Sequence, residues 1–186
     1  MRWRHLLVGI TALAAGVAPG LGQGLEAENL LTGLPEGFEL GSQVREGVMD
    51  MSEFVPVGET VRDWTRLITI QVFKGEGDAP IQLFAESLQQ GWNSACADAS
   101  NARLAEGVVN GYPYADWRFV CPLSPHTDKP EAMWMRAVSG NDAFYVVQYA
   151  YRVEPTPERE AEARTYLEGV SVCDTRLAEH ACPSGM

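Results

Sequence analysis

The stretch EAMWMRAVSGNDAFYVVQYAYR, residues 131–152, decides the fold of this protein. Two runs rich in aromatic and β-branched residues, 131–139 and 143–152, lie on either side of Gly140-Asn141-Asp142, which favours a turn. Runs of this composition are typical of strands, and a short polar connection joins strands that are antiparallel. The stretch therefore predicts a hairpin whose two strands lie at the centre of a sheet.

The same signals recur in four earlier segments: 38–45, 48–55, 102–109 and 112–121. Asn110-Gly111 separates the last two and is the strongest short-range hairpin signal that a sequence contains. Glu46-Gly47 separates the first two, whose polar and apolar residues alternate as in half-buried strands. Residues 67–73, LITIQVF, are a further predicted strand because they are rich in β-branched residues.

Two segments have the signals of helices. Pro80 stands where a helix would begin, with Asp78 as a candidate cap. Apolar residues then recur at spacings of three and four: Ile81, Phe84, Leu88, Trp92 and Ala95. This stripe is expected to lie on the sheet as part of the core. Thr156-Pro157-Glu158 provides a cap, a proline and an acid, which predict a second helix to about Glu168 that Gly169 ends.

The segments at the two ends of this region have weaker signals. Residues 25–34 form a short lead-in, which we expect to be a loose helix that Pro35-Glu36-Gly37 ends. Residues 170–173 either add a short strand or pack as a loop. The tail from about residue 174 is expected to be mobile except where Cys182 holds it.

The predicted elements follow the order strand, strand, strand, helix, four strands in hairpins, and helix. This order is typical of an α+β fold, in which two main helices pack on one antiparallel sheet of about six to seven strands. About 160 residues follow residue 24, which suffices for one hydrophobic core. We therefore expect residues 25–186 to form a single domain with a tethered C-terminal tail.

Residues 1–24, MRWRHLLVGITALAAGVAPGLGQG, have the three parts of an export signal. A basic start with two arginines precedes an apolar run, 6–18, and small residues follow at Gly20-Leu21-Gly22. The run is shorter than the roughly 20 apolar residues that a membrane span needs. We expect cleavage after Gly22 or Gly24, and a mature protein that is periplasmic or secreted and not inserted in a membrane.

The predicted mature chain is strongly acidic. Removal of Arg2 and Arg4 lowers the number of lysines and arginines from 14 to 12 against 25 acidic residues, so the net charge changes from −11 to −13. A field of this sign repels phosphate groups and anionic lipids, which argues against nucleic acid as a partner. It favours a well-solvated surface or a basic partner, and neighbouring acids such as Asp50 and Glu53 are expected on a solvated face.

Four cysteines lie in the predicted mature chain, and an even number is typical of disulfides in exported proteins. Four cysteines allow three pairings. We favour Cys96–Cys121, which would join a helix end to a strand end, and Cys173–Cys182, whose members are close in sequence. The spacings match no zinc motif.

The residue types typical of catalysis form no recognisable motif. His126 and His180 are the only histidines after residue 24. Ser124, His126 and Asp128 have the residue types of a catalytic triad, but residues two apart seldom adopt its geometry. His126 with Asp128, or His180 near Cys182, provides too few ligands for a metal ion. We expect no catalytic, cofactor or metal site.

Two features of the sequence suit a binding role. Residues 122–130, PLSPHTDKP, contain three prolines and form either a stiff recognition loop or a rigid connection between hairpins. Most of the mature-chain tryptophans are expected in the core, and a subset is a candidate lining for an apolar pocket: Trp64, Trp92, Trp117 and Trp134. Alternation places Tyr114 and Asp116 on the strand face opposite to Trp117, and leaves open which face is exposed.

The order of elements over residues 36–172 resembles the PsbP-like fold of photosystem accessory proteins and bacterial periplasmic proteins. Four stretches are also similar to a family of uncharacterised exported bacterial proteins: EFVPVGETVRDWTRLITIQVF (53–73), NGYPYADWRFVCPLSPHTDKPE (110–131), GNDAFYVVQYAYR (140–152) and VCDTR (172–176). The resemblance to the PsbP-like group implies accessory, assembly or binding roles rather than catalysis. It carries over no functional residue, because the sequence contains no matching motif.

Three functions remain after the sequence is read. The first is an exported, soluble, non-enzymatic accessory module of the bacterial cell envelope that binds a protein through a sheet edge, the proline-rich loop or its acidic surface. The second is a periplasmic carrier of a small apolar or aromatic ligand. The third is an enzyme of unrecognised type, which would need convergent polar groups in a cleft.

Overall fold

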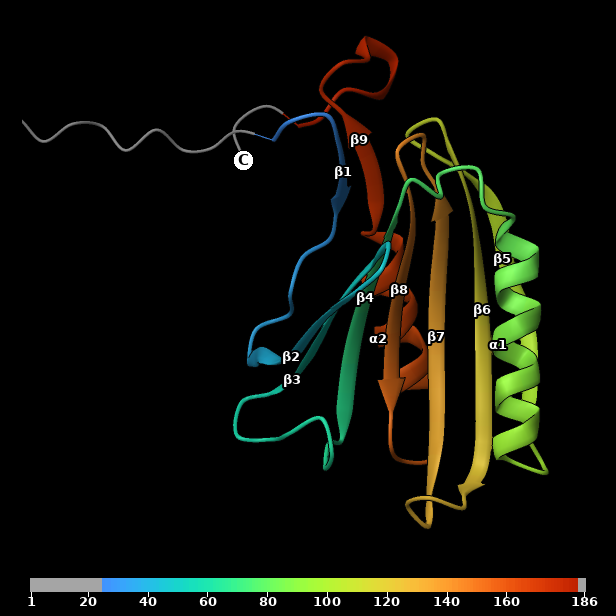
Figure 1. The fold of residues 1–186 in the computed structure, drawn as a ribbon. Helices are drawn as coiled ribbons and strands as arrows, with labels where there is room; N and C mark the ends of the chain where they lie inside the picture. The colour runs from blue at the N-terminus through green and yellow to red at the C-terminus, as the bar shows by residue number, and fades with distance from the viewer. Residues whose placement is uncertain (1–24, 184–186) are drawn as a thin grey trace, which may run out of the picture.

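A seven-stranded antiparallel sheet forms the body of the protein, with the strands in the order β2-β3-β4-β8-β7-β6-β5 (Figure 1). The computed structural model describes residues 25–183, so the predicted export signal lies outside the described residues. The strands are β2 (Phe38–Glu46), β3 (Met49–Pro56), β4 (Arg66–Lys74), β5 (Ser100–Val109), β6 (Tyr112–Ser124), β7 (Lys129–Ser139) and β8 (Ala143–Tyr151). The predicted α+β fold is confirmed.

The central hairpin is β7–β8, as the stretch 131–152 predicts. Its strands lie between β4 and β6, and every residue from Ala132 to Val138 is buried. The hairpins β2–β3 and β5–β6 are also present, and Asn110 and Gly111 both have the positive φ that a tight hairpin turn requires. Strand β4 pairs with β8 along its whole length, from Arg66 opposite Tyr151 to Lys74 opposite Ala143. The hairpins therefore join into one sheet through a long-range pairing.

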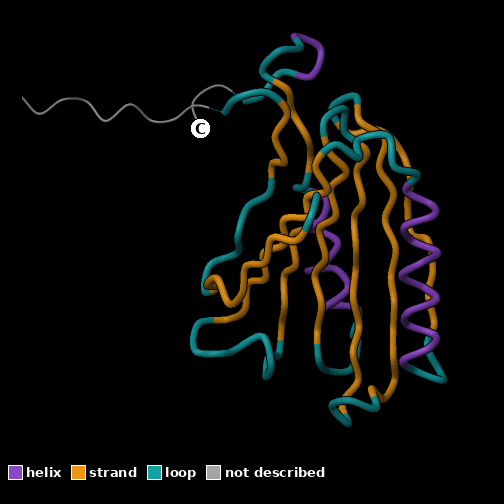
Figure 2. The backbone as a smooth tube through the Cα atoms, in the orientation of Figure 1, coloured by secondary structure: helices purple, strands orange, loops and turns teal. Residues whose placement is uncertain are grey.

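Two helices cover opposite faces of this sheet. Helix α1 (Ile81–Ala95) packs on β6 and β7, and helix α2 (Pro157–Glu168) packs on β7 and β8 (Figure 2). The predicted stripe of α1 meets the β6 side chains Trp117 and Phe119, while α2 places Ala163 and Leu167 against Trp134 and its neighbours. No helix within residues 25–183 is long and apolar enough to cross a membrane.

The helix ends match the prediction for α2 and differ for α1. The Oγ1 atom of Thr156 accepts a hydrogen bond from the backbone N–H of Arg159, and Gly169 follows the last turn. The N-cap of α1 is Pro80 rather than Asp78. Proline fixes the backbone at this position but its side chain cannot accept a hydrogen bond, so α1 depends on its apolar stripe.

The prediction of a loose helix over residues 25–34 is wrong. Strand β1 (Glu28–Leu31) occupies this segment and pairs with β9 (Ser171–Asp174) in a separate two-stranded antiparallel sheet. Leu30 packs beside the buried Val172. This long-range pairing overrides the local preference, and it gives residues 170–173 the short strand that was one of their two alternatives.

Within the described residues, the C-terminal segment contacts the rest of the protein at more places than the Cys173–Cys182 disulfide. A short 3₁₀ helix (Ala178–His180) lies against the β5–β6 turn. The Nδ1 atom of His180 is 2.8 Å from the carbonyl oxygen of Asn110, and its ring lies 4.8 Å from that of Tyr112. A side chain at Gly111 would collide with the His180 ring, so glycine at this turn makes the docking possible.

Both favoured disulfides are present. Cys96 and Cys121 join the end of α1 to β6, and Cys173 and Cys182 join β9 to the tail. The prediction of a proline-rich loop over residues 122–130 is wrong in extent, because β6 and β7 continue into it. Only residues 125–128 form a turn. Pro122 and Pro130 lie near strand ends, where the pairing register shifts and a missing N–H is tolerated.

Candidate functional site

One half of the sheet face that carries α1 has no helix over it (Figure 1). Phe73 of β4 contacts Phe84 of α1, with ring centroids 5.8 Å apart, so Phe73 lies on this face. Met49 pairs directly with Phe73, Met51 pairs with Gln71, and Val44 pairs with Met51. Directly paired residues share a face. We call this surface, Val44, Met49, Met51, Gln71 and Phe73, the open face.

A groove of about 380 Å³ continues the open face at the start of α1. Its lining is mainly apolar: Val48, Phe73, Glu76, Ala79, Pro80, Leu83, Phe84 and Phe144. Three aromatic rings form its floor, with centroids between 5.3 and 6.0 Å apart. Val48 and Leu83 on its rim are 50% and 60% exposed, and Val44 on the open face is 39% exposed. The open face and the groove that continues it thus expose large apolar side chains to solvent.

A second groove, of about 340 Å³, lies at the other end of α1. Its lining contains both cysteines of one disulfide: Leu88, Gly91, Trp92, Ala95, Cys96, Cys121, Ser124, His126 and Glu131. On a helix, Phe84, Leu88, Gly91 and Ala95 follow one another at spacings of three and four and share one edge. The two grooves therefore lie at the two ends of this edge of α1, and we call the edge together with both grooves the furrow. A helix of 15 residues is about 22 Å long.

Gln71, the polar residue of the open face, is hydrogen-bonded to Gln148 of β8. The Nε2 atom of Gln148 donates to Oε1 of Gln71 at 3.2 Å, and Nε2 of Gln71 lies 3.6 and 3.8 Å from the sulfur atoms of Met49 and Met51. Methionine is flexible and polarizable, so a surface of this composition adapts its shape to a contacting molecule.

The open face is acidic at its edges. Glu46 and Glu53 lie beside it on the same side of the sheet, because they pair with Met49 and Thr69, and Glu76 lines the adjoining groove. None of these three carboxylates forms an ion pair within residues 25–183. Asp50 lies on the opposite face of β3 from Glu53, because their partners on β4 are Val72 and Thr69.

The nearby cationic side chains form ion pairs with Asp50, on the face of the sheet opposite to the open face. Arg45 and Lys74 lie 2.5 and 2.6 Å from its carboxylate oxygens. Hydrogen bonds from these two residues hold the pKa of Asp50 below its usual value. Because the two cations are engaged with Asp50, they leave the charge of Glu46, Glu53 and Glu76 uncompensated.

Two larger grooves are lined by charges that neutralise one another. The groove along α2, of about 570 Å³, contains Arg118 and Glu160, which are 3.1 Å apart. The groove on the β5 side of α1, of about 520 Å³, contains the ion pair of Arg103 with Glu106. The charges of both grooves are therefore largely paired, whereas Glu46, Glu53 and Glu76 beside the open face form no ion pair within residues 25–183.

Ser124, His126 and Asp128, which have the residue types of a catalytic triad, do not form one in the structure. Ser124 is buried at the second groove, His126 is exposed on its rim, and Asp128 occupies the adjacent turn with a φ of 54°. Within the described residues, no hydrogen bond joins these three side chains, and no group of three or more His, Cys, Asp or Glu is placed to hold a metal ion. His180 contacts Asn110, and Cys182 is in a disulfide.

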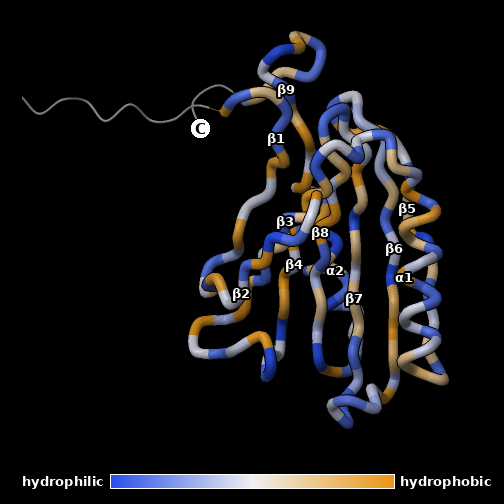
Figure 3. The backbone as a smooth tube through the Cα atoms, viewed as in Figure 1, coloured by the Kyte–Doolittle hydropathy of each residue, from blue (hydrophilic) through white to orange (hydrophobic). Residues whose placement is uncertain are grey.

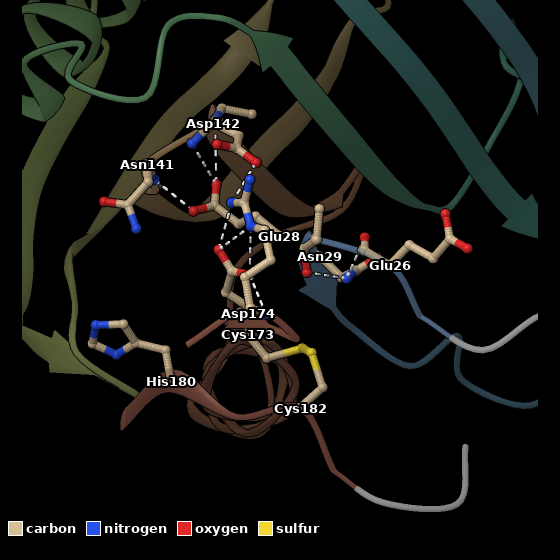
Figure 4. Close-up of polar contacts among 12 residues, drawn as sticks. Glu26, Glu28, Asn29, Asn141, Asp142, Cys173, Asp174, His180 and Cys182 are labelled. Atoms are coloured by element: carbon tan, nitrogen blue, oxygen red, sulfur yellow. Dashed lines mark hydrogen bonds and ion pairs between the residues drawn. A yellow bond between two sulfur atoms is a disulfide. The ribbon is translucent and has the colours of Figure 1, made fainter. Parts of the chain in front are cut away.

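A polar cluster that the sequence did not indicate joins both chain ends to the β7–β8 turn (Figure 4). The Glu28 carboxylate accepts hydrogen bonds from the backbone N–H groups of Asn141, Asp142 and Ala143, and from the Tyr145 hydroxyl. Nothing in the local sequence distinguishes Glu28 from the other acidic residues of the chain. Its role depends on the β1–β9 pairing, which brings it to a turn more than a hundred residues away.

The second carboxylate of this cluster is Asp174, which is fully buried. Arg176 donates to it through Nε and Nη2, and also to Asp142. The hydrogen bonds from Arg176 lower the pKa of Asp174. Burial, with Glu28 nearby, raises the pKa of Tyr112 to about 12. The two carboxylates are engaged by donors of the protein itself, so the cluster is a structural clamp.

The tryptophans divide between the core and the furrow. Trp64, Trp117 and Trp134 are buried, whereas Trp92 is half-buried and lines the second groove. Both faces of β6 are packed, because Asp116 forms a bidentate pair with the buried Arg136 on the face opposite to Trp117. Figure 3 shows hydrophobic and hydrophilic residues interspersed along the strands of the sheet and along α1.

No protein-family model matches the sequence, and no curated protein does. The structure is similar to the solution structure of cyanobacterial PsbP (CyanoP) from Synechocystis sp. PCC 6803, with a TM-score of 0.51 and 8% identity over 85% of this chain and 98% of that chain. The Ran-binding protein Mog1p of Saccharomyces cerevisiae gives a TM-score of 0.42 and 14% identity over 74% of this chain and 78% of that chain. The chain therefore has a PsbP-like α+β fold.

Proposed function

We propose that the protein is an exported, non-enzymatic accessory module of the bacterial cell envelope that binds another protein through the open face. The observation that carries this proposal is the exposure of Val44 on the open face and of Val48 and Leu83 on the rim of the aromatic-floored groove that continues it. Covering such a surface removes apolar area from water, which stabilises a complex by roughly 25 cal/mol for each Å². Exposed apolar surface of this kind marks interaction sites in proteins.

The chemistry of the open face supports binding rather than catalysis. Its valine, methionine and phenylalanine side chains provide contact area and contain no nucleophile or proton-transfer group. Methionine and aromatic residues are enriched in protein interfaces. The export part of the proposal rests on the signal-like residues 1–24 and on the two disulfides, because disulfides persist in oxidising compartments.

Affinity capture with matched variants tests the proposal. The mature protein, Leu83→Ser and Leu40→Ser are used as baits in native envelope extract at low and high salt, and recovered proteins are identified by mass spectrometry. Leu40 is a suitable control because it is 55% exposed and pairs with Phe54 on the other face of the sheet. We expect one protein that the wild type and Leu40→Ser retain and Leu83→Ser loses. Equal recovery by all three baits would contradict the open face as the site.

The second groove supports a second candidate function, the carriage of a small apolar ligand. Its volume of about 340 Å³ lies within the range of small-molecule sites, and Trp92 with the Cys96–Cys121 disulfide gives it an apolar wall. A small lipophilic compound that raises the melting temperature of the wild type but not of Trp92→Ala would favour this function. Absence of any shift across such compounds would remove it.

A further inference from the structure

We infer that the partner segment that binds the open face is an amphipathic α-helix with a basic flank, lying beside α1 as a second helix on the same face of the sheet. This inference rests on the proposed function and specifies the chemistry of the partner. Three independent features of the described residues support it: the width of the uncovered sheet, the shape of the furrow along α1, and the uncompensated charge at its edges.

The width of the uncovered sheet fits one helix. Helix α1 lies above β6 and β7, and Phe144 and Val146 of β8 are buried in the same cluster. The next position on this face is above β8 and β4, where Gln71 and Gln148 are half-buried. Two strand spacings separate these positions, a distance of about 10 Å. Packed helices have axes about 8–10 Å apart, so a helix above β8 and β4 would contact α1 on one side and the open face on the other.

The furrow has a gap in the place where a second helix would approach α1 most closely. Gly91 lies on the furrow edge of α1, between Leu88 and Ala95, and a Cβ atom there would meet no other atom within 4 Å. Glycine inside a helix costs about 1 kcal/mol relative to alanine. Its φ is not positive and nothing in the described protein crowds it, so no internal contact accounts for it. A glycine at a helix surface permits close approach of another backbone.

The negative charge at the edges of the open face favours a partner with positive charge. Along the strands, the apolar pair of Val44 and Met51 lies between Glu46 at one end and Glu53 at the other. Glu76 adds a third carboxylate in the groove. A helix whose apolar stripe covers the centre would place its flanking residues beside these carboxylates. Lysine or arginine at the flanks is attracted to them, whereas an acidic flank, like an anionic lipid surface, is repelled.

Synthetic peptides test this chemistry directly. The probe is a fluorescent peptide of about 15 residues, the length of α1, with leucine along one helical face and lysine elsewhere. One comparison peptide has glutamate in place of lysine, and another has two central prolines that prevent a helix. Fluorescence anisotropy at physiological salt measures binding to the mature protein. We expect the lysine peptide to bind at least about tenfold more tightly than either comparison peptide.

Variants of the protein separate the open face from general attraction to an acidic surface. We expect Glu46→Gln with Glu76→Gln to weaken binding of the lysine peptide about tenfold, while the control Glu36→Gln with Glu168→Gln changes it less than about twofold. Gly91→Leu fills the furrow, so it should weaken peptide binding to a similar degree while leaving the protein at least as stable to heat. The control Gln90→Leu, on an exposed position of α1, should not weaken it.

Equal weakening by the control pair, or equal binding of the glutamate or proline peptide, would overturn the inference. These results are distinguishable from failure of the proposed function. If Leu83→Ser loses the captured envelope protein but the peptides show no preference, the open face still binds a protein and the basic helix is wrong. If Leu83→Ser and Leu40→Ser behave alike in both assays, the proposed function fails and the inference fails with it.

Discussion

Glu28 shows how a single side chain fixes the N-terminal segment. Its carboxylate accepts hydrogen bonds from three backbone N–H groups of the β7–β8 turn. The N–H of Ala143 is part-buried, and loss of its partner would cost about 1–3 kcal/mol. Asp174 and Arg176 fix the opposite chain end in the same cluster. These residues could not be found from the sequence, because acidic residues are abundant in it and only the folded chain brings these to one turn.

Gly140→Ala tests the clamp around Glu28. A Cβ atom at Gly140 would collide with Oε1 of Glu28 and lie 2.7 Å from the carbonyl oxygen of Ala143. We expect this variant to lower the free energy of unfolding by about 1–3 kcal/mol, measured by urea denaturation. Gly33→Ala is the control, since a Cβ there meets nothing within 4 Å. Equal stability of the two variants would show that Glu28 moves freely.

Asp174 gives the cluster a dependence on pH. Its pKa is lower in the folded protein than in the unfolded chain, so in acid the unfolded state takes up the proton first and is favoured. Its contribution is therefore present above the ordinary aspartate pKa of about 4 and is lost as the pH falls through the lowered value. We expect Asp174→Asn to destabilise the protein at neutral pH and the deficit to shrink toward pH of about 3. A deficit that stays constant with pH would contradict this role.

Among the helices, strands and turns, the sequence correctly predicted those that are stabilised by residues close to each other in the chain. The Asn110-Gly111 turn, the β7–β8 hairpin and the Thr156 cap all appear where the sequence placed them. The errors occur where a distant segment decides. Part of the segment 25–34 becomes a strand because β9 pairs with it, and Pro122 and Pro130 are accommodated near strand ends where the register shifts.

The cap of α2 is the most direct test of an element. Thr156→Ala removes the acceptor for the N–H of Arg159, and we expect it to lower the free energy of unfolding by about 1 kcal/mol. Thr165→Ala changes the same residue type at an exposed position inside α2, where alanine is the better helix former. We expect this control to be neutral or slightly stabilising. Chemical denaturation of both variants measures the difference, and similar losses would argue against the cap.

For the whole molecule, the arrangement of sheet and helices creates the candidate site. The sheet has seven strands, and α1 reaches only part of one face. The sequence predicted the stripe of α1 and the hairpins, but not the open face. That surface exists because β4 pairs with β8, which places the β2–β3 hairpin beyond the reach of α1. This long-range pairing leaves no local sequence signal.

The disulfide at the second groove contributes to the stability of the whole domain. Cys96 and Cys121 are separated by 25 residues, and closing such a loop stabilises the folded state by roughly 3 kcal/mol in the chain-entropy model. We expect Cys96→Ser with Cys121→Ser to lose about this much, and Cys173→Ser with Cys182→Ser to lose less, because that bridge spans nine residues near the chain end. Calorimetry of both double variants measures the order, and the reverse order would contradict it.

The central claim, that the open face binds a protein, is tested most directly by site-specific photo-crosslinking in cells of the source organism. A photoreactive amino acid replaces Leu83 in one strain and Leu40 in another. The two leucines have similar exposure, but Leu83 belongs to α1 beside the open face, whereas Leu40 lies on the opposite face of the sheet. We expect position 83 to crosslink to one envelope protein. The crosslinked segment should have apolar residues at spacings of three and four with basic residues beside them. Position 40 should give no such product. The same product from both positions, or none from position 83, would contradict the claim.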